Sequence, residues 1–130
     1  MSDVLSGDRG AWRVLLACVL ALTAFVVTGQ AKAAYAAPSI HSIITGCTTA
    51  AGFGTLDVAA MKKIADYESH DNPKSHSTSC WGLFQLSTKM AKGHPWADAT
   101  WNTKRALKYV KGRYGTPRKA WAHIKKTGWY

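Results

Sequence analysis

Glu68 is the only glutamate in the 130-residue chain, and it falls on the apolar stripe of an expected helix. The stripe has the spacing i, i+3, i+4 and i+7, and it consists of Met61, Ile64, Ala65 and Glu68. Residues at this spacing share one helical face, which packs on a core or lines a cleft. Desolvation there and the negative end of the helix dipole both raise the pKa of a carboxyl group. Glu68 therefore suits a general acid, although a solvated glutamate at a helix end would give the same pattern.

Three further motifs surround or follow this glutamate in a fixed order. The first is Glu68-Ser69-His70-Asp71-Asn72-Pro73, which has the form E-S-x-x-N-P. The second is Trp81-Gly82-Leu83-Phe84-Gln85. The third runs through Tyr109-Val110-Lys111-Gly112-Arg113-Tyr114-Gly115-Thr116-Pro117, Ala120-Trp121-Ala122-His123 and the closing Gly128-Trp129-Tyr130. Each motif alone is a weak signal, but their order and compatible spacing together make a strong one.

This set of motifs closely resembles the soluble lytic transglycosylase domain of the lysozyme-like superfamily, in the short version found in actinobacteria and their phages. The resemblance covers roughly residues 56–130. It implies a mainly α, lysozyme-like α+β fold, with at most a short hairpin near residues 74–86. It also implies cleavage of the β-1,4 bond between N-acetylmuramic acid and N-acetylglucosamine in peptidoglycan, without a cofactor.

The resemblance also implies roles for individual residues. Glu68 protonates the glycosidic oxygen and then acts as base on the muramoyl C6 hydroxyl, which leaves 1,6-anhydromuramic ends. The family works with one glutamate, which fits a chain with so few carboxylates. Four residues are expected to bind substrate or shape its site: Ser69, Gly82, Gln85 and Tyr109. Of these, Gln85 is similar to a cleft-lining amide of the family, and Tyr109 is the aromatic residue assigned to the cleft.

Two departures from the family pattern leave alternatives open. The small residues expected in the second motif are replaced by Ser79-Cys80, and the A-Y-N motif of larger transglycosylases is replaced by Ala120-Trp121-Ala122. The tyrosine that contacts Glu68 is therefore undetermined, and a lysozyme-type hydrolase stays an alternative to a transglycosylase. A non-enzymatic, basic wall-binding or antimicrobial protein is the third interpretation, against which the in-phase Glu68 argues.

The N-terminal residues have the layout of a secretory signal peptide. Arg9 and Arg13 precede an apolar run over residues 14–27, and an alanine-rich stretch ends at Ala34-Tyr35-Ala36. The run is short for a membrane span, which needs about 20 apolar residues. We expect cleavage after Ala36 and a secreted or wall-associated product. An uncleaved membrane anchor is the alternative.

The cysteines fit an exported protein. Cys18 leaves with the signal peptide, and Cys47 and Cys80 remain as an even pair. A disulfide is the default for such a pair, and it would add roughly 3–4 kcal/mol in the chain-entropy model. No C-x-x-C or compact Cys/His cluster is present, so no metal site is expected.

Charge indicates an anionic partner. The net charge is +10, and about +9 once residues 1–36 are removed, with many basic residues between Lys104 and Lys126. Peptidoglycan strands and other anionic wall polymers are the nearest partners of an exported basic protein. The stripe Lys104-Arg105-Lys108-Lys111 would also suit phosphates, but no nucleic-acid motif is present and the export signal disfavours that partner. We expect a monomer.

The remaining elements follow from capping and breaker signals. Residues 37–55 are rich in small residues and are predicted to form a loosely packed linker. Helices are expected over residues 56–69, 101–114 and 117–127, with a short one from Ser87 toward Met90. Tyr114 and Trp121 are assigned to the core, and Trp81 and Trp96 either to the core or to sugar stacking.

Overall fold

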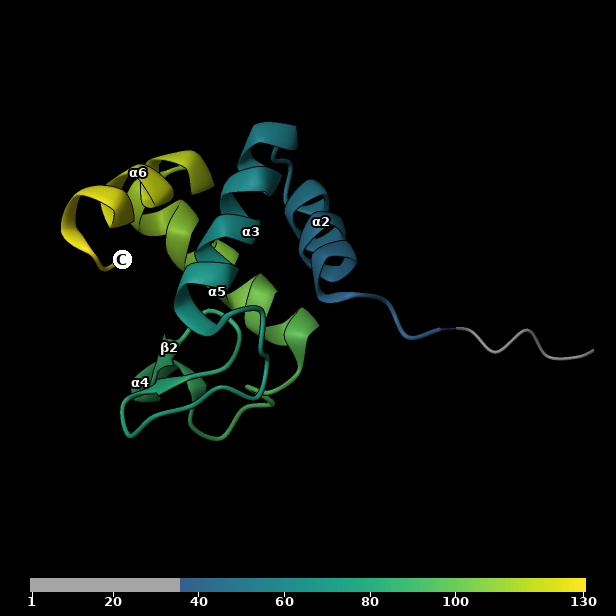
Figure 1. Ribbon diagram of the computed structural model, residues 1–130, viewed down its shortest axis with the longest axis vertical. Helices are drawn as coiled ribbons and strands as arrows, with labels where there is room; N and C mark the ends of the chain where they lie inside the picture. Colours follow the sequence, from purple (N-terminus) through teal and green to yellow (C-terminus); the bar gives the residue numbers. More distant parts are fainter. Residues whose placement is uncertain (1–35) are drawn as a thin grey trace, which may run out of the picture. The chain divides into compact units, whose positions relative to one another are not determined.

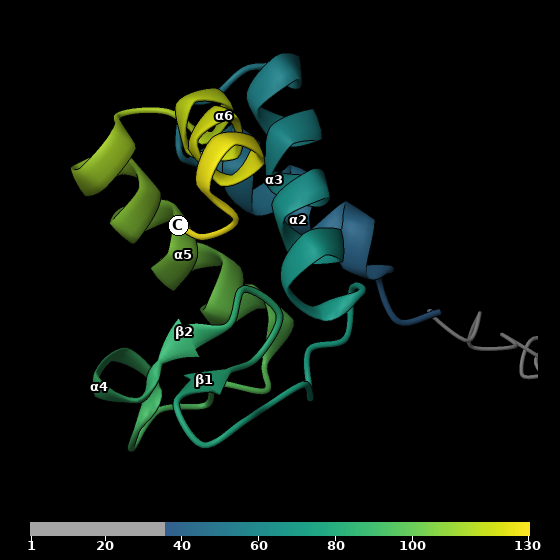
Figure 2. The same cartoon turned by 60° about the vertical axis from the view of Figure 1, so that its left-hand side comes forward.

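The computed structural model describes residues 36–130, of which Ala37–Tyr130 form one compact unit. The signal peptide predicted for residues 1–36 lies outside the described residues apart from Ala36. The helices are α2 (Ile40–Ala50), α3 (Thr55–Ser69), α4 (Thr88–Ala91), α5 (Ala99–Tyr114) and α6 (Pro117–Thr127). Strands β1 (Cys80–Trp81) and β2 (Leu86–Ser87) pair antiparallel (Figures 1 and 2). The predicted mainly helical domain with one short hairpin is confirmed.

The four longer helices enclose the core. Helix α2 packs on α3 and α5, and α6 packs on α3 and α5, so the four helices pack in a ring around the core (Figure 1). The hairpin and α4 lie at one end of this bundle, below the C-terminal end of α3 (Figure 2). The largest fully buried side chains are Phe84, Ile44, Met61, Ile64, Leu83, Ile124 and Val110. Two of these, Leu83 and Phe84, come from the turn between the strands and connect the hairpin to the helical core.

Helix α2 corrects the prediction of a loosely packed linker over residues 37–55. Ser39 caps its N-terminus, since the Ser39 hydroxyl accepts from the Ser42 amide at 3.2 Å. Ile44 and Thr48 are fully buried, and Thr48 donates back to the Ile44 carbonyl at 2.7 Å. The isoleucines and Cys47 are spaced at i, i+3, i+4 and i+7, which is helical spacing. Small polar residues between them hid this stripe.

The predicted disulfide is also wrong, because Cys47 and Cys80 are both free cysteines. Cys47 lies on α2 and faces α5, whereas Cys80 lies on β1 in a cavity beneath Tyr130. The two cavities share no lining residue, and a disulfide needs Cα atoms within about 7 Å of each other. The N-terminal part of the unit is therefore held by the packing of α2 and not by a cross-link.

The capping predictions are confirmed, with small shifts of the boundaries. Helix α5 begins at Ala99 because the Asp98 carboxylate accepts from the Trp101 amide at 2.6 Å. Helix α6 begins at Pro117, preceded by Thr116 as its N-cap. Helices α5 and α6 end at Gly115 and Gly128. Within residues 36–130, no helix is long and apolar enough to span a bilayer.

Candidate active site

Helix α3 places Glu68 at the rim of the core. Met61, Ile64 and Ala65 on the same face are fully buried, and Glu68, one turn further on, is half-buried. Loss of water raises the pKa of Glu68 from 4.5 to about 7. The predicted raised pKa is confirmed, and its cause is desolvation. Glu68 therefore exists as a mixture of acid and carboxylate near neutral pH.

The other side-chain carboxylates within residues 36–130 all have a polar neighbour. Asp57 accepts from Arg118, Asp71 lies 2.8 Å from His41, and Asp66 lies 3.7 Å from His70. Asp98 is used as a helix cap. Among these described residues, Glu68 alone has a side-chain carboxylate with no hydrogen-bond or ion-pair partner. Its pKa is raised by desolvation. A group in this state is available to a ligand.

The end of α3 is fixed by the residues directly after Glu68. Ser69 is buried, and its hydroxyl donates to the carbonyls of Ala65 at 3.1 Å and Leu83 at 2.8 Å. The bond to Leu83 joins the helix carrying Glu68 to the turn of the hairpin. Ser69 was predicted to bind substrate, and the structure places its hydroxyl inside the protein, where it positions the two elements. His70 then ends the helix in the left-handed region, with φ +52°.

Gly82 begins the turn that faces this helix end. It has φ +84°, and a Cβ at this position would collide with the Asn102 side chain and the Trp96 carbonyl. Its amide donates to the Ser75 carbonyl at 2.7 Å. Only glycine fits both the positive φ and the close approach of Asn102 and the Trp96 carbonyl, so Gly82 shapes the turn, and its contact with a substrate stays a prediction.

Gln85 ends the turn, also in the left-handed region with φ +46°. Its Nε2 donates to the carbonyls of Ser75 at 3.1 Å and Gly82 at 2.8 Å. Both amide hydrogens are thus used on backbone carbonyls, one in the preceding loop and one in the turn, which leaves Oε1 as the polar atom that a ligand can reach. Gln85 also lines the cavity described below, in agreement with a cleft-lining amide.

Asn102 on α5 holds the turn from the other side, and sequence analysis missed it. It is fully buried, its Oδ1 accepts from the Phe84 amide at 2.9 Å, and its Nδ2 donates to the carbonyls of Trp96 at 2.9 Å and Trp81 at 3.3 Å. An asparagine beside the buried stripe of a helix is the only signal that the sequence offers for it. The turn that faces Glu68 is therefore held rigidly by α3 and α5 together.

Tyr130 is the second residue that sequence analysis missed, since the closing motif contained it without a role. Its hydroxyl donates to the Phe84 carbonyl at 2.7 Å. Burial raises the pKa of Tyr130 well above its ordinary value, and the nearby charge of Glu68 is the next cause. Tyr130 is thus a tyrosine whose hydroxyl lies in the electrostatic field of Glu68.

A cavity of about 190 Å³ lies between the hairpin, α5 and the C-terminal residue. Its lining is Cys80, Phe84, Gln85, Leu86, Ser87, Met90, Tyr109 and Tyr130. Tyr109 and Tyr130 contact edge to face, with ring centroids 5.7 Å apart. Tyr109 therefore lines the cavity, as does Tyr130, the tyrosine whose pKa responds to the charge of Glu68; Glu68 itself is not among the lining residues. The space admits a small group such as part of a sugar ring.

The remaining aromatic residues mostly support the core. Trp81 and Trp96 pack edge to face at 5.0 Å and are partly buried against it. Tyr114 is also partly buried, and burial raises the pKa of its hydroxyl. Trp121 packs against the core with one side and lines a surface hollow with the other. The predicted core positions of Tyr114 and Trp121 are therefore supported, with an additional exposed side for Trp121.

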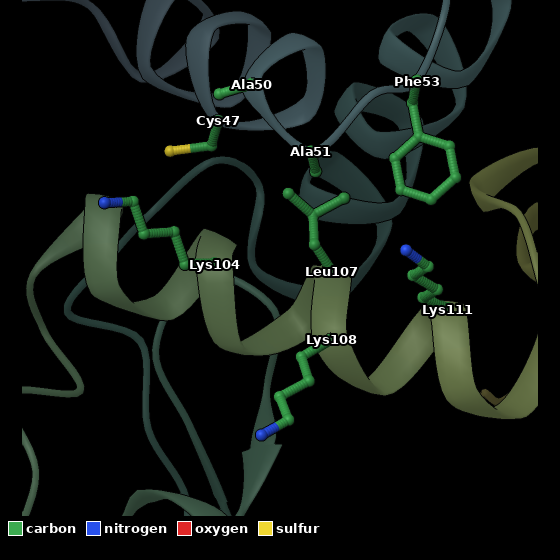
Figure 3. Close-up of a pocket in the computed structure, with 8 residues that line it drawn as sticks. All are labelled: Cys47, Ala50, Ala51, Phe53, Lys104, Leu107, Lys108 and Lys111. Atoms are coloured by element: carbon green, nitrogen blue, oxygen red, sulfur yellow. The ribbon is translucent and has the colours of Figure 1, made fainter.

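A separate basic cavity of about 380 Å³ lies between α2 and α5. Figure 3 shows Cys47, Ala50, Ala51 and Phe53 on one side and Lys104, Leu107, Lys108 and Lys111 on the other. Lys104 reaches toward Cys47, whereas Lys108 points away from the cavity (Figure 3). Burial raises the pKa of the Cys47 thiol, and the Lys104 ammonium group lowers it in part. The cavity has an apolar floor and is flanked by lysines, which suits an anionic group. Glu68 is not among its lining residues.

Metal chemistry has no obvious location in this part of the chain. Among residues 36–130, no group of three or more His, Cys, Asp or Glu side chains is placed to hold a metal ion.

Comparison of the chain with protein-family models, with curated proteins and with solved structures finds no match.

Proposed function

We propose that the protein is a peptidoglycan lytic transglycosylase of the lysozyme-like type, with Glu68 as its single acid/base group. One observation carries the proposal: Glu68 is the unpartnered carboxylate of the described residues, and its pKa is about 7. A general acid is most effective when its pKa lies near the working pH. The motif resemblance in sequence supplies the substrate class.

The first step of the proposed reaction is proton transfer. Protonated Glu68 donates to the oxygen that links N-acetylmuramic acid to N-acetylglucosamine, and the C1–O bond breaks. Positive charge develops at C1 of the muramoyl sugar, where the oxygen of its own acetamido group attacks and stabilises it. This assistance replaces the second carboxylate that most glycosidases use, and it suits a site with one free carboxylate.

The second step returns the proton that Glu68 gave. The Glu68 carboxylate accepts the proton of the muramoyl C6 hydroxyl, and the C6 oxygen attacks C1 as the acetamido oxygen leaves. The product is a 1,6-anhydromuramic end, no water is consumed, and Glu68 is protonated again. The same group serves as acid and as base, which a pKa close to neutrality allows.

The turn of the hairpin positions the substrate in this proposal. Oε1 of Gln85 is free to accept from the N–H of an acetamido group, and Tyr109 presents an aromatic side chain to the same cavity. Ser69, Asn102 and Tyr130 act as positioning residues, because each is bonded to the turn backbone.

We also propose an extracytoplasmic location and contact with anionic wall polymers. The N-terminal sequence supports export, and the net charge of +10 favours anionic polymers. The lysine-flanked cavity between α2 and α5 offers a place for one anionic group of such a polymer.

Product analysis tests the proposal. Purified peptidoglycan is digested with the protein, with Glu68→Gln and with the control Asp98→Asn, which changes an exposed carboxylate and keeps a side chain able to cap α5. Muropeptides one water lighter than hydrolysis products, lost in Glu68→Gln and retained in Asp98→Asn, are expected. Reducing-end products would instead make the protein a lysozyme-type hydrolase. Lysis or binding without bond cleavage, equal in all three forms, would favour a non-enzymatic wall-binding protein.

A further inference from the structure

The outer surface of α3 and α6 carries a hollow that the proposed reaction does not use. Its volume is about 630 Å³, and its lining is Lys63, Asp66, Tyr67 and His70 from α3 and Trp121 and Lys125 from α6. It shares no lining residue with the cavity beside Glu68. The hollow is open and large enough for more than one sugar ring.

Two aromatic side chains form its base. Tyr67 and Trp121 meet edge to face, with centroids 6.2 Å apart and planes at 71°, so they present two faces at an angle. Tyr67 is 49% exposed, yet its hydroxyl donates to the Gly128 carbonyl at 3.1 Å. This bond fixes an exposed aromatic ring that would otherwise be free to rotate. Rigid, exposed aromatic rings bind ligands at a low cost in conformational entropy.

The rim of the hollow is polar and carries both signs of charge. Lys63 and Lys125 are exposed, and within residues 36–130 neither ammonium group has an acidic partner within ion-pair distance. Asp66 and His70 lie on the same side, 3.7 Å apart. Aromatic faces below and a few hydrogen-bonding groups above are the combination that recognises a sugar, which has an apolar C–H face and a polar edge.

We propose that this hollow is a second carbohydrate site, which holds an acidic aminosugar strand by stacking on Tyr67 and Trp121 and by pairing its carboxylates with Lys63 and Lys125. The identity of the strand as peptidoglycan rests on the proposed function. The lactyl group of a muramic sugar that carries no stem peptide supplies the carboxylate, and its ring supplies the C–H face.

The hollow and the active-site cavity are connected through the C-terminal residues. The Gly128 carbonyl accepts the hydrogen bond from the Tyr67 hydroxyl. Tyr130, two residues after Gly128, lines the active-site cavity. Tyr67 itself directly precedes Glu68 in the chain. A strand held in the hollow therefore stays close to the acid/base group after each cleavage, so the site retains the enzyme on its polymer.

Binding without turnover tests the site. In Glu68→Gln, the tryptophan indole N–H resonances are followed by NMR while a peptide-free tetrasaccharide of alternating N-acetylglucosamine and N-acetylmuramic acid is added. Trp121 is assigned with Trp121→Phe. A shift of the Trp121 resonance is expected, and a titration in which the Trp81 resonance, next to the 82–85 turn, shifts while the Trp121 resonance stays in place would overturn the proposal.

A charge-matched pair of variants separates the site from general attraction. Lys63→Glu/Lys125→Glu changes two lysines of the hollow, and Lys119→Glu/Lys126→Glu makes the same charge change at exposed positions outside it. The first variant should bind the acidic tetrasaccharide about tenfold more weakly than the second. Binding of neutral chitotetraose, which lacks carboxylates, should respond equally to both. Equal affinities of the two variants for the acidic sugar would overturn the lysine contacts.

The two proposals fail in distinguishable ways. Wall cleavage by the unmodified protein without a Trp121 shift would leave the proposed function standing and remove the second site. A Trp121 shift with no cleavage by the unmodified protein would leave the carbohydrate site standing and remove the enzymatic function.

Discussion

The two ends of α3 each carry an acidic residue on the inward side, and the protein treats them differently. Asp57, in the first turn, is 6% exposed and accepts from both the Arg118 amide at 3.1 Å and the Arg118 Nε at 3.2 Å. Glu68, in the last turn, is half-buried with no partner among the described residues, and desolvation raises its pKa to about 7. The partnered carboxylate of Asp57 connects α3 to α6, whereas the carboxylate of Glu68 is the one that the proposed function assigns to a substrate.

The comparison shows why sequence position alone does not identify an acid/base group. Both residues are carboxylates on one helix, and both lose water. The difference is the neighbour, since the N-terminus of α6 supplies two donors to Asp57 and the turn at residues 82–85 supplies none to Glu68. The donors of that turn bind elsewhere, to the carbonyls of Ser75 and Gly82 and to the Asn102 side chain. The substitutions described next test this difference between the two carboxylates.

The largest effect is expected for Glu68→Gln on activity. Glutamine keeps the shape of the side chain and cannot give or take the proton, so wall cleavage should fall by about 10²- to 10⁴-fold. The measurement is the initial rate of anhydromuropeptide release. Asp57→Asn serves as the matched carboxylate control and should keep its rate per folded molecule; a similar loss there would break the contrast.

The second effect is on stability at the other end of the helix. Asp57→Ala removes both bonds to Arg118, and we expect the free energy of unfolding to fall by about 2 kcal/mol. The loss stays below that of a fully buried pair because the Arg118 side chain is 57% exposed and can be hydrated. Urea unfolding measures it, with the exposed Asp66→Asn as a control that should change by less than about 0.5 kcal/mol.

The third effect is a gain in folding stability, opposite in sign to the loss expected for Asp57→Ala. The folded-state pKa of Glu68, about 7, lies above its ordinary 4.5, so folding stability falls as the pH rises from 4.5 through 7. Glu68→Gln removes this loss and should be more stable than the unmodified protein by about 1–2 kcal/mol at pH 8, a value reduced from the full shift because the group is partly hydrated. The two proteins should be equally stable near pH 4. A constant difference across this range would contradict a raised pKa.

The smallest effect is expected at Tyr130. Tyr130→Phe removes the hydrogen bond to the Phe84 carbonyl and should cost about 1 kcal/mol of stability. If Tyr130 positions the turn, kcat for wall cleavage should fall by several fold while the alkaline limb of the pH profile, which reports loss of the Glu68 proton, stays at the same pH. Unchanged kcat at unchanged stability would show that the turn does not depend on this bond.

The helices and the position of Glu68 could be predicted from sequence because their signals are local. Apolar spacing placed Met61, Ile64 and Glu68 on one face, and Asn72-Pro73 marked the end of the helix. Helix α2 was missed because its stripe of isoleucines is diluted by Ser, Thr and Gly, and its burial comes from packing on α5. The disulfide was inferred from cysteine number alone, which contains no information about distance.

The turn and its supports could be predicted only in part. Gly82 and Gln85 stood out through the motif, but the bonds that fix their turn join Phe84 to Asn102, 18 residues later, and to Tyr130, 46 residues later. Contacts between residues far apart in the chain leave no periodic trace in one sequence. The partner of Asp57 was hidden for the same reason, since Arg118 is 61 residues away.

Direct titration of Glu68 tests the central claim. Because the chain contains a single glutamate, incorporation of glutamate labelled with ¹³C at Cδ gives one side-chain carboxyl signal of this type without assignment. Its chemical shift is followed by NMR from acidic to alkaline pH in the protein without substitutions, in which the Asp57–Arg118 pair is intact. The account predicts a midpoint of about 7. A midpoint at the ordinary value of 4.5 would show a solvated carboxylate and would remove the basis for Glu68 as the acid/base group.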